Sequence, residues 1–156
     1  MSQAEALWSV EFEIKPLGLQ GPEPSSVFHV TSGEDSGVLG TRYPAIYIAE
    51  NEQKLLIRYD ISGKTNQKYK QPTELSENSW TTVNVKQEDR DGTVFFVITI
   101  NDEVAYQQEN TKPRRFPYMK VYSADPWYPQ RANVQIRNLR YITSPSTCNY
   151  RIRSLF

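Results

Sequence analysis

Apolar and polar residues alternate with a period of two along most of this chain. From Leu7 to Ile14 every second side chain is apolar, and Ser9 and two glutamates lie between them. This alternation is typical of a β-strand with one buried face. The pattern recurs in further segments, namely Ser26–Thr31, Tyr43–Ala49, Leu55–Ile61, Trp80–Gln87, Val94–Asn101, Val104–Gln107, Tyr118–Ser123 and Asn133–Thr143. Helical spacing is nearly absent, so the sequence predicts an all-β protein of about nine short strands.

Turn residues separate the predicted strands. Asp60–Gly63, Asp89–Gly92 and Asn101–Asp102 hold residues that tolerate a left-handed backbone, and each lies between two alternating segments. Parallel strands would need long crossover connections, so the short connections favour an antiparallel β-sandwich. The longer connections are Pro16–Ser25, Ser32–Arg42, Gln108–Pro117 and Ala124–Ala132, and loops of this kind often carry binding sites.

The composition fits one soluble globular domain. The chain has 156 residues, of which 38% are hydrophobic and 23% charged, enough to bury a core. We expect a single domain over 1–156, with 144–156 as a C-terminal tail or edge strand. Cys148 is the only cysteine, so an internal disulfide is excluded. The first residues lack the pattern of a secretory signal, so we expect a cytoplasmic location or secretion without an evident signal peptide.

The net charge of zero hides a segregation along the chain. Residues 1–109 hold 9 basic and 17 acidic side chains, whereas residues 110–156 hold 9 basic side chains and Asp125 alone. The basic segment could recognise an anion such as a sulfated glycan or a nucleic acid. The sequence pI of 6.6 is low for a nucleic-acid-binding domain, so we favour charge pairing within the fold or between protomers.

Two stretches resemble the concanavalin A-like and laminin-G-like superfamily. They are the Trp-led segment Trp80–Gln87 with the following hairpin Gly92–Glu103, and the segment Val134–Tyr141 with its Ile-Arg-Asn-Leu sequence. The resemblance implies a jelly-roll sandwich and is strongest to soluble lectins of marine invertebrates such as sponges. The Gly-Cys pair of many laminin-G domains is replaced by Val134-Gln135, and the galectin sequence pattern and the metal-binding acidic cluster of legume lectins are absent.

The best candidate for a ligand site is the loop between Tyr122 and Asn133. Two prolines stiffen it, so its side chains lose less freedom when a ligand binds. An aromatic ring can pack against the apolar face of a sugar, and charged and amide groups beside it can bind the hydroxyl groups at the sugar's edge. The predicted carbohydrate-binding residues are Tyr122, Asp125, Trp127, Tyr128, Arg131 and Asn133. In the alternative interpretation, the two aromatic residues plug the end of the core and Asp125 caps a turn.

A second candidate loop spans Thr31–Arg42. Its glycines would let the backbone approach a ligand, and Glu34, Asp35 and Arg42 could contact hydroxyl groups. A flexible surface connection has the same composition, and we favour that interpretation.

Signals for catalysis are weak. Glu11 and Glu13 point the same way from one predicted strand, but the glycosidases of this superfamily carry a Glu-x-Asp-x-x-Glu strand, and this chain has Pro16 at the last position. We expect these glutamates to form a solvent-facing surface. His29 is the only histidine, so a site of several histidines is excluded, and we expect it to be an ordinary strand residue.

The sequence therefore predicts a carbohydrate-binding lectin that is not an enzyme and uses no cofactor or metal. We expect it to bind a hexose or N-acetylhexosamine on glycans or glycoconjugates, with no nucleic acid partner and no membrane insertion. Single sugar sites are usually weak, so multivalency predicts a homo-oligomer, either a dimer or a tetramer. The alternative is a laminin-G-like protein-interaction module without a sugar site.

Overall fold

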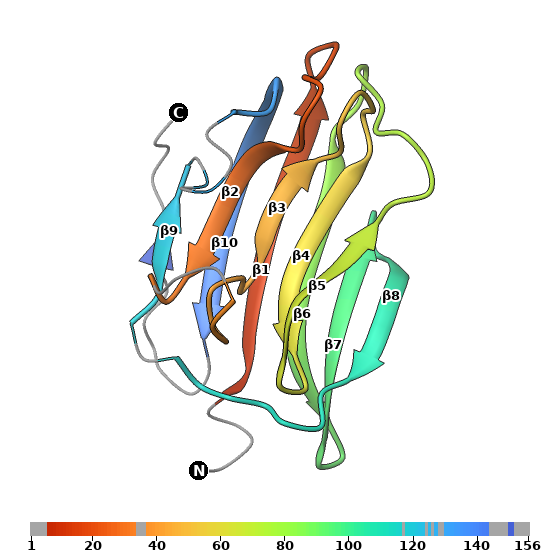
Figure 1. Ribbon diagram of the computed structural model, residues 1–156. Coiled ribbons are helices and arrows are strands. Elements are labelled where there is room, and N and C mark those ends of the chain that lie inside the picture. Colours follow the sequence, from red (N-terminus) through yellow and green to blue (C-terminus); the bar gives the residue numbers. More distant parts are fainter. Residues whose placement is uncertain are drawn as a thin grey trace.

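The computed structural model forms an antiparallel β-sandwich (Figure 1). It describes residues 6–33, 37–116, 118–123, 125, 127, 130–143 and 150–151. The described residues form eleven β-strands in two sheets and no α-helix. All pairings between these strands are antiparallel, so the predicted fold class is confirmed.

The first sheet has six strands and is referred to as sheet A. In spatial order they are β11 (Tyr150–Arg151), β10 (Val134–Thr143), β1 (Trp8–Pro16), β6 (Thr81–Arg90), β7 (Thr93–Ile100) and β8 (Glu103–Glu109). The two ends of the described chain meet in this sheet, because β1 pairs with β10 over most of its length.

The second sheet, sheet B, has five strands and packs against sheet A. In spatial order they are β5 (Lys64–Lys70), β4 (Leu55–Ile61), β3 (Ala45–Ile48), β2 (Ser25–Thr31) and β9 (Lys120–Tyr122). Figure 1 shows β9 beside β2 at one edge and β5 at the other. The short strand β9 pairs only with residues 29–31 of β2.

The predicted tight turns are confirmed as hairpins. Ser62-Gly63 joins β4 to β5, Asp91-Gly92 joins β6 to β7, and Asn101-Asp102 joins β7 to β8. All six residues have a positive φ, between 49° and 87°. Two successive residues with positive φ match the right-handed twist of the flanking strands, which is why Gly, Asn and Asp occur at these turns.

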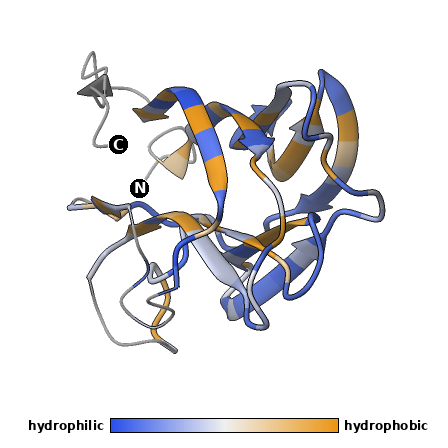
Figure 2. Ribbon diagram, turned by 90° about the horizontal axis from the view of Figure 1, so that it is seen from above, coloured by the Kyte–Doolittle hydropathy of each residue, from blue (hydrophilic) through white to orange (hydrophobic). Residues whose placement is uncertain are grey.

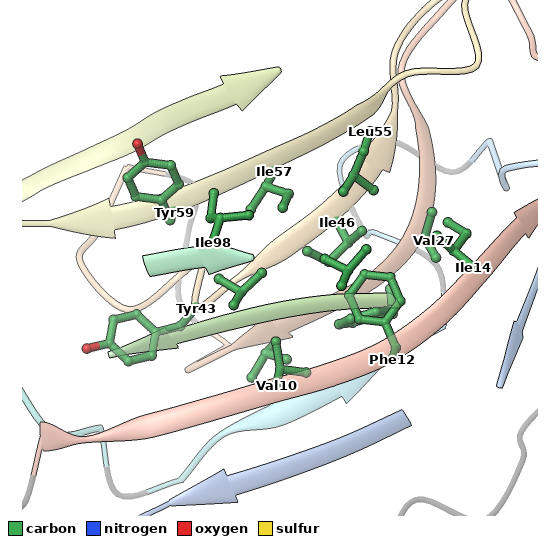
Figure 3. Close-up of a cluster of buried hydrophobic side chains, with 14 of the residues drawn as sticks. Val10, Phe12, Ile14, Val27, Tyr43, Ile46, Leu55, Ile57, Tyr59 and Ile98 are labelled. Atoms are coloured by element: carbon green, nitrogen blue, oxygen red, sulfur yellow. The ribbon is translucent and has the colours of Figure 1, made fainter. Parts of the chain in front are cut away.

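The core lies between the sheets and follows the period-two alternation (Figure 3). In β1 the residues Trp8, Val10, Phe12 and Ile14 are buried, whereas those between them are partly exposed. Phe12 contacts Phe28 of the opposite sheet edge-to-face, with ring centroids 4.9 Å apart. Figure 2 shows the same alternation as orange and blue bands along the strands.

Sheet B differs from sheet A because the outer face of β2 and β3 is also buried. All residues of β2 and β3 are buried, on both faces of the sheet. On β3 and β4 the outward side chains form a second apolar cluster, made of Ala45, Tyr47, Ala49 and Leu56. Sheets covered on both faces carry near-continuous apolar runs, so this face is the place where a loop packs onto the sandwich.

One long strand was not expected from the sequence. The β5 strand, Lys64–Lys70, pairs with β4 and is mostly polar. It is an edge strand whose residues alternate between exposed and partly exposed, so no apolar period marks it. Charged residues are common on edge strands because they discourage pairing with other chains.

The opposite charges of the two chain segments meet across β1 and β10. Glu13 accepts hydrogen bonds from Arg137 at 2.9 and 3.0 Å, and Glu11 forms an ion pair with Arg140. The Arg137 guanidinium holds the pKa of Glu13 below its usual value. Charge pairing within the fold is confirmed for these two pairs. They are partly exposed and therefore screened by salt.

Candidate functional site

The loop predicted to bind sugar crosses the edge of sheet B and is anchored to β2 at both ends. Before the loop, β9 pairs with β2 and ends at Tyr122. After the loop, Ser26 donates its N–H to the Gln130 carbonyl (2.8 Å), and the Ala132 N–H donates to the Ser26 carbonyl (2.9 Å). Residue 131 forms a parallel bridge with Ser26. Both ends of the loop are therefore held beside the edge of β2.

Asp125 is the buried anchor of this loop, with only 2% of its surface exposed. His29 Nδ1 lies 2.7 Å from Asp125 Oδ2, and the Tyr47 hydroxyl donates a short hydrogen bond to the same oxygen. The Trp127 N–H donates to Oδ1 at 2.6 Å, and the Asp125 N–H donates to the Ser26 hydroxyl at 3.0 Å. Both carboxylate oxygens are thus used inside the protein.

The hydrogen-bond partners indicate which atoms of this cluster carry a hydrogen. His29 Nε2 lies against the Thr41 carbonyl oxygen, which can only accept, so Nε2 carries a hydrogen. Burial raises the pKa of Asp125, but the hydrogen bonds from His29, Tyr47 and the Trp127 N–H together outweigh this effect, so the pKa lies below its usual value. Burial also raises the pKa of Tyr47, so its hydroxyl keeps the proton that it donates.

Trp127 packs on the buried cluster and also contacts a cation. Its ring meets the His29 ring edge-to-face at 5.1 Å, and the Arg42 guanidinium carbon lies 4.8 Å from its centroid. The side chain is half-buried on the outer side of sheet B. One part of the indole surface is therefore already covered by protein groups, which limits the area open to a sugar.

Only 5% of the surface of Arg42 is exposed. Its Nε has no hydrogen-bond partner among the described residues. The nearby negative charge is Asp60, whose carboxylate accepts the N–H groups of Gly40, Arg42 and Asn66. Burial raises the pKa of Asp60 more than these bonds lower it. Arg42 comes from the second candidate loop, and the other two candidates there, Glu34 and Asp35, lie outside the described residues.

A cavity of about 450 Å³ lies at the base of the predicted loop, where sheets A and B open towards each other. Near this opening β10 has β1 as its only neighbour among the described strands, because β11 pairs only with residues 140 and 141. The cavity is lined by residues of β2, of β10 and of the loop, together with Trp80: Ser26, Val27, Ser123, Arg131, Ala132, Val134, Gln135, Ile136 and Arg137.

The wall of the cavity is basic where Trp80 lies. The Arg137 guanidinium carbon is 4.1 Å from the Trp80 ring centroid, and Lys15 Nζ is 5.2 Å from it. Trp80 precedes β6 and Arg137 lies on β10, and both line the cavity, whereas Lys15 lies on β1 and is not among the lining residues. Cations over an indole ring are attracted by its negative face.

The structure distributes the predicted sugar-binding residues over different environments. Arg131 is exposed and lines the cavity, and Tyr122 is 38% exposed on β9. Asn133 is exposed, and its backbone pairs with the Gln20 side chain at 2.9 and 3.1 Å. Tyr128 lies outside the described residues. The turn-capping alternative for Asp125 agrees with its bond to the Trp127 N–H.

Sequence reasoning did not connect several residues that the structure brings together. His29 was expected to be an ordinary strand residue, and Tyr47 and Gln135 were assigned no role. Two weak signals exist in the sequence. A histidine between Phe28 and Val30 is polar within an apolar segment, and Tyr47 alternates with isoleucines in a strand, so both need a buried polar partner.

Two further findings apply to the part of the chain that the structure describes. It contains no group of three or more His, Cys, Asp and Glu side chains placed to hold a metal ion. Within the same residues, no helix has the length and apolar character needed to cross a membrane.

Comparison with known proteins finds similarity in structure only. No protein-family model and no curated protein matches the chain. A heptameric SAP-like pentraxin from Limulus polyphemus has a TM-score of 0.55 and 15% identity, over 87% of this chain and 63% of the pentraxin. Botulinum neurotoxin type C has a TM-score of 0.53 and 16% identity, over 86% of this chain and 32% of the toxin chain.

An endo-β-1,4-glucuronan lyase from the fungus Trichoderma reesei is also similar, with a TM-score of 0.55 and 13% identity, over 88% of this chain and 66% of the lyase. Identities this low show a shared fold alone. The chain spans less than two thirds of each of these three proteins.

Proposed function

Starting from the concanavalin A-like jelly-roll fold that these structures share with the chain, we propose that this protein is a non-catalytic glycan-binding domain, a lectin. The observation that carries the proposal is the cavity at the base of the predicted loop. Its volume of about 450 Å³ lies within the range of small-ligand pockets, and its wall combines apolar side chains with a few polar groups.

The predicted residues other than Tyr128, which lies outside the described residues, can be assigned roles or positions in this proposal. Arg131, together with Gln135 and Ser123, supplies the hydrogen-bonding groups of the cavity. Tyr122 and Asn133 adjoin lining residues along the chain, so we assign them to its rim, whereas Trp127 is not among the lining residues. Asp125 does not touch the sugar but acts as a positioning residue, because its carboxylate fixes the loop to His29 and Tyr47. A rigid loop reduces the entropy lost on binding.

The similar structures support a glycan as the ligand. The work on botulinum neurotoxin type C describes its dependence on two ganglioside molecules, and the fungal protein is a glucuronan lyase. Binding a glycan and cleaving it are thus both found among proteins with this fold. We favour binding without cleavage here because Glu11 and Glu13, the carboxylate pair considered for catalysis, form ion pairs with Arg140 and Arg137. Release of reducing sugar from a β-glucan, lost in Glu11→Gln, would contradict this choice.

We further propose the properties of a soluble invertebrate lectin, of the kind known from sponges. These are recognition of a hexose or N-acetylhexosamine, a dimer or tetramer that compensates for weak single sites, and a cytoplasmic location or secretion without an evident signal peptide. Light scattering at low and high salt tests the assembly. A particle that remains monomeric at every protein concentration would contradict it.

The inward packing of Asp125 and Trp127 favours a second candidate function. A laminin-G-like protein-interaction domain without a sugar site is expected to use this loop for stability rather than for ligand contact. Its binding would then map to a sheet edge, and Arg131 variants would leave it unchanged.

Glycan binding is expected to change the fluorescence of one particular tryptophan. Of the three tryptophans, Trp8 is buried in the core, Trp127 packs on His29, and Trp80 lines the cavity. A glycan that binds on an array and is competed by a monosaccharide should therefore alter the emission of the wild type and of Trp127→Phe, but not that of Trp80→Phe.

The matched pair of Trp→Phe variants separates the two parts of the site. A change in emission that persists in Trp80→Phe but disappears in Trp127→Phe would show that the sugar binds at the loop and not in the cavity. No binding to any glycan on the array would overturn the proposed function.

A further inference from the structure

The cavity has an excess of positive charge. Arg131 and Arg137 line it, and no Asp or Glu is among its lining residues. Arg137 is neutralised by Glu13, but Arg131 forms no salt bridge with any described residue. One cation without an acidic partner among the described residues therefore lines a cavity that is open to solvent.

The aromatic surface near the cavity is occupied by cations. Arg137 and Lys15 lie over Trp80, and Arg42 lies over Trp127. A neutral sugar that stacks on an aromatic ring needs a bare face for its C–H groups. Such a sugar would have to displace a cation–π contact here, which costs part of the energy gained by stacking. This arrangement disfavours recognition by stacking alone.

An anionic group suits the same surface better. The planar guanidinium of arginine matches a carboxylate or sulfate with two parallel hydrogen bonds, and these charge-assisted bonds are stronger than bonds to hydroxyl groups. Arg131 is free to adopt this geometry because it is exposed and makes no ion pair with a described residue. Gln135 and Ser123 in the same wall can bond the hydroxyl or acetamido groups of the sugar ring.

We propose that the glycan bound in this cavity is acidic, and that Arg131 binds its carboxylate or sulfate group. This inference rests on the proposed glycan-binding function and names the ligand class of the same site. The expected ligand is then an anionic sugar residue instead of a neutral hexose, because cations already lie over the aromatic faces on which a neutral hexose would stack.

Pairs of oligosaccharides that differ only in charge test the ligand class. Hyaluronan hexasaccharide is compared with the same chain after its carboxyl groups are reduced to alcohols. Chondroitin sulfate hexasaccharide is compared with the desulfated chain, which separates sulfate from carboxylate. Titration calorimetry at low salt is expected to show binding about tenfold tighter for at least one acidic member than for its less charged partner, the value of one charge-assisted hydrogen bond.

Variants test the residue assignment. Arg131→Gln is expected to weaken the acidic ligand about tenfold, to leave any binding of the carboxyl-reduced chain unchanged, and to keep the thermal midpoint of the wild type. Arg131→Lys keeps the charge but loses the two parallel hydrogen bonds, so its affinity should lie between those of the wild type and Arg131→Gln. Lys68→Gln is the matched control, because Lys68 is an exposed cation on β5, at the opposite edge of sheet B from β9.

The outcomes separate this inference from the proposed function. Equal affinity for the acidic and the reduced chains would overturn the inference and leave a lectin for neutral sugars. An equal loss of affinity in Lys68→Gln and Arg131→Gln would show diffuse charge attraction and overturn the assignment to the cavity. No binding of any of these chains or of any glycan on the array would overturn the proposed function itself.

Discussion

Asp125→Ala is expected to lower the free energy of unfolding by about 3–5 kcal/mol, because several buried polar groups lose a charged acceptor. The substitution removes the acceptor of three donors, namely His29 Nδ1, the Tyr47 hydroxyl and the Trp127 N–H. Neither His29 nor Tyr47 is exposed to water, so their donors cannot find a solvent partner while the fold persists. Urea unfolding followed by tryptophan fluorescence measures the change.

Asp89→Ala is the matched control for this experiment. Asp89 is exposed and accepts one N–H, from Gly92 at 2.7 Å, in the turn between β6 and β7. The same change in side chain should therefore cost only about 0.5–1.5 kcal/mol, the net value of one ordinary hydrogen bond. The anchoring role of Asp125 would be contradicted if the free energies of unfolding of the two variants differed by less than about 1 kcal/mol.

The contribution of Asp125 is expected to depend on pH in a defined direction. Its folded pKa lies below the usual value, so the stability it supplies is fully present above the pKa of the unfolded chain, about 4. That stability is lost as the pH falls through the folded pKa. The stability difference between wild type and Asp125→Ala should therefore become smaller as the pH falls below about 4.

Phe12→Ala is expected to destabilise the sandwich by about 3–5 kcal/mol, as found for large aromatic truncations in cores. Phe12 has no exposed surface, lies on β1 between β10 and β6, and contacts Phe28 across the two sheets. Its removal leaves a cavity that neighbouring strands cannot fill without losing their register.

Two further variants keep this prediction testable if Phe12→Ala does not fold. Phe12→Leu retains most of the volume and should cost less than about 2 kcal/mol. Ser9→Ala changes an outward, partly exposed position of the same strand and should shift the unfolding midpoint little. A core role for Phe12 requires Phe12→Leu to destabilise the protein more than Ser9→Ala does, and an equal effect of the two variants would contradict it.

Much of the fold was predictable from local pattern, and the exceptions have physical reasons. The alternation in β1 predicted its buried face because side chains of a strand point to opposite sides of the sheet. The Asp-Gly and Asn-Asp turns predicted their hairpins because few residues tolerate a positive φ. The β5 strand escaped prediction because an exposed edge strand buries little and carries no apolar period.

The candidate site was predictable only in part. The loop around Trp127 was identified from its prolines and aromatic residues, and Arg131 does line the cavity. The burial of Asp125 was not predictable, because His29 precedes it by 96 residues and Tyr47 by 78. The same holds for the cations over Trp80, which come from strands at both ends of the chain. Contacts at such separations depend on strand order, which local pattern does not specify.

The sequence by itself determined the strand faces, the hairpin turns and the class of fold, since all three follow from local side-chain chemistry and backbone sterics. Only the tertiary structure decided which charges cancel and which remain. Placing β10 beside β1 pairs Glu11 and Glu13 with Arg140 and Arg137, whereas Arg131 lines the cavity without an acidic partner among the described residues. Electrostatic energy depends on distance in space rather than along the chain, so the sequence showed the segregation of charge but not where that charge becomes available to a ligand.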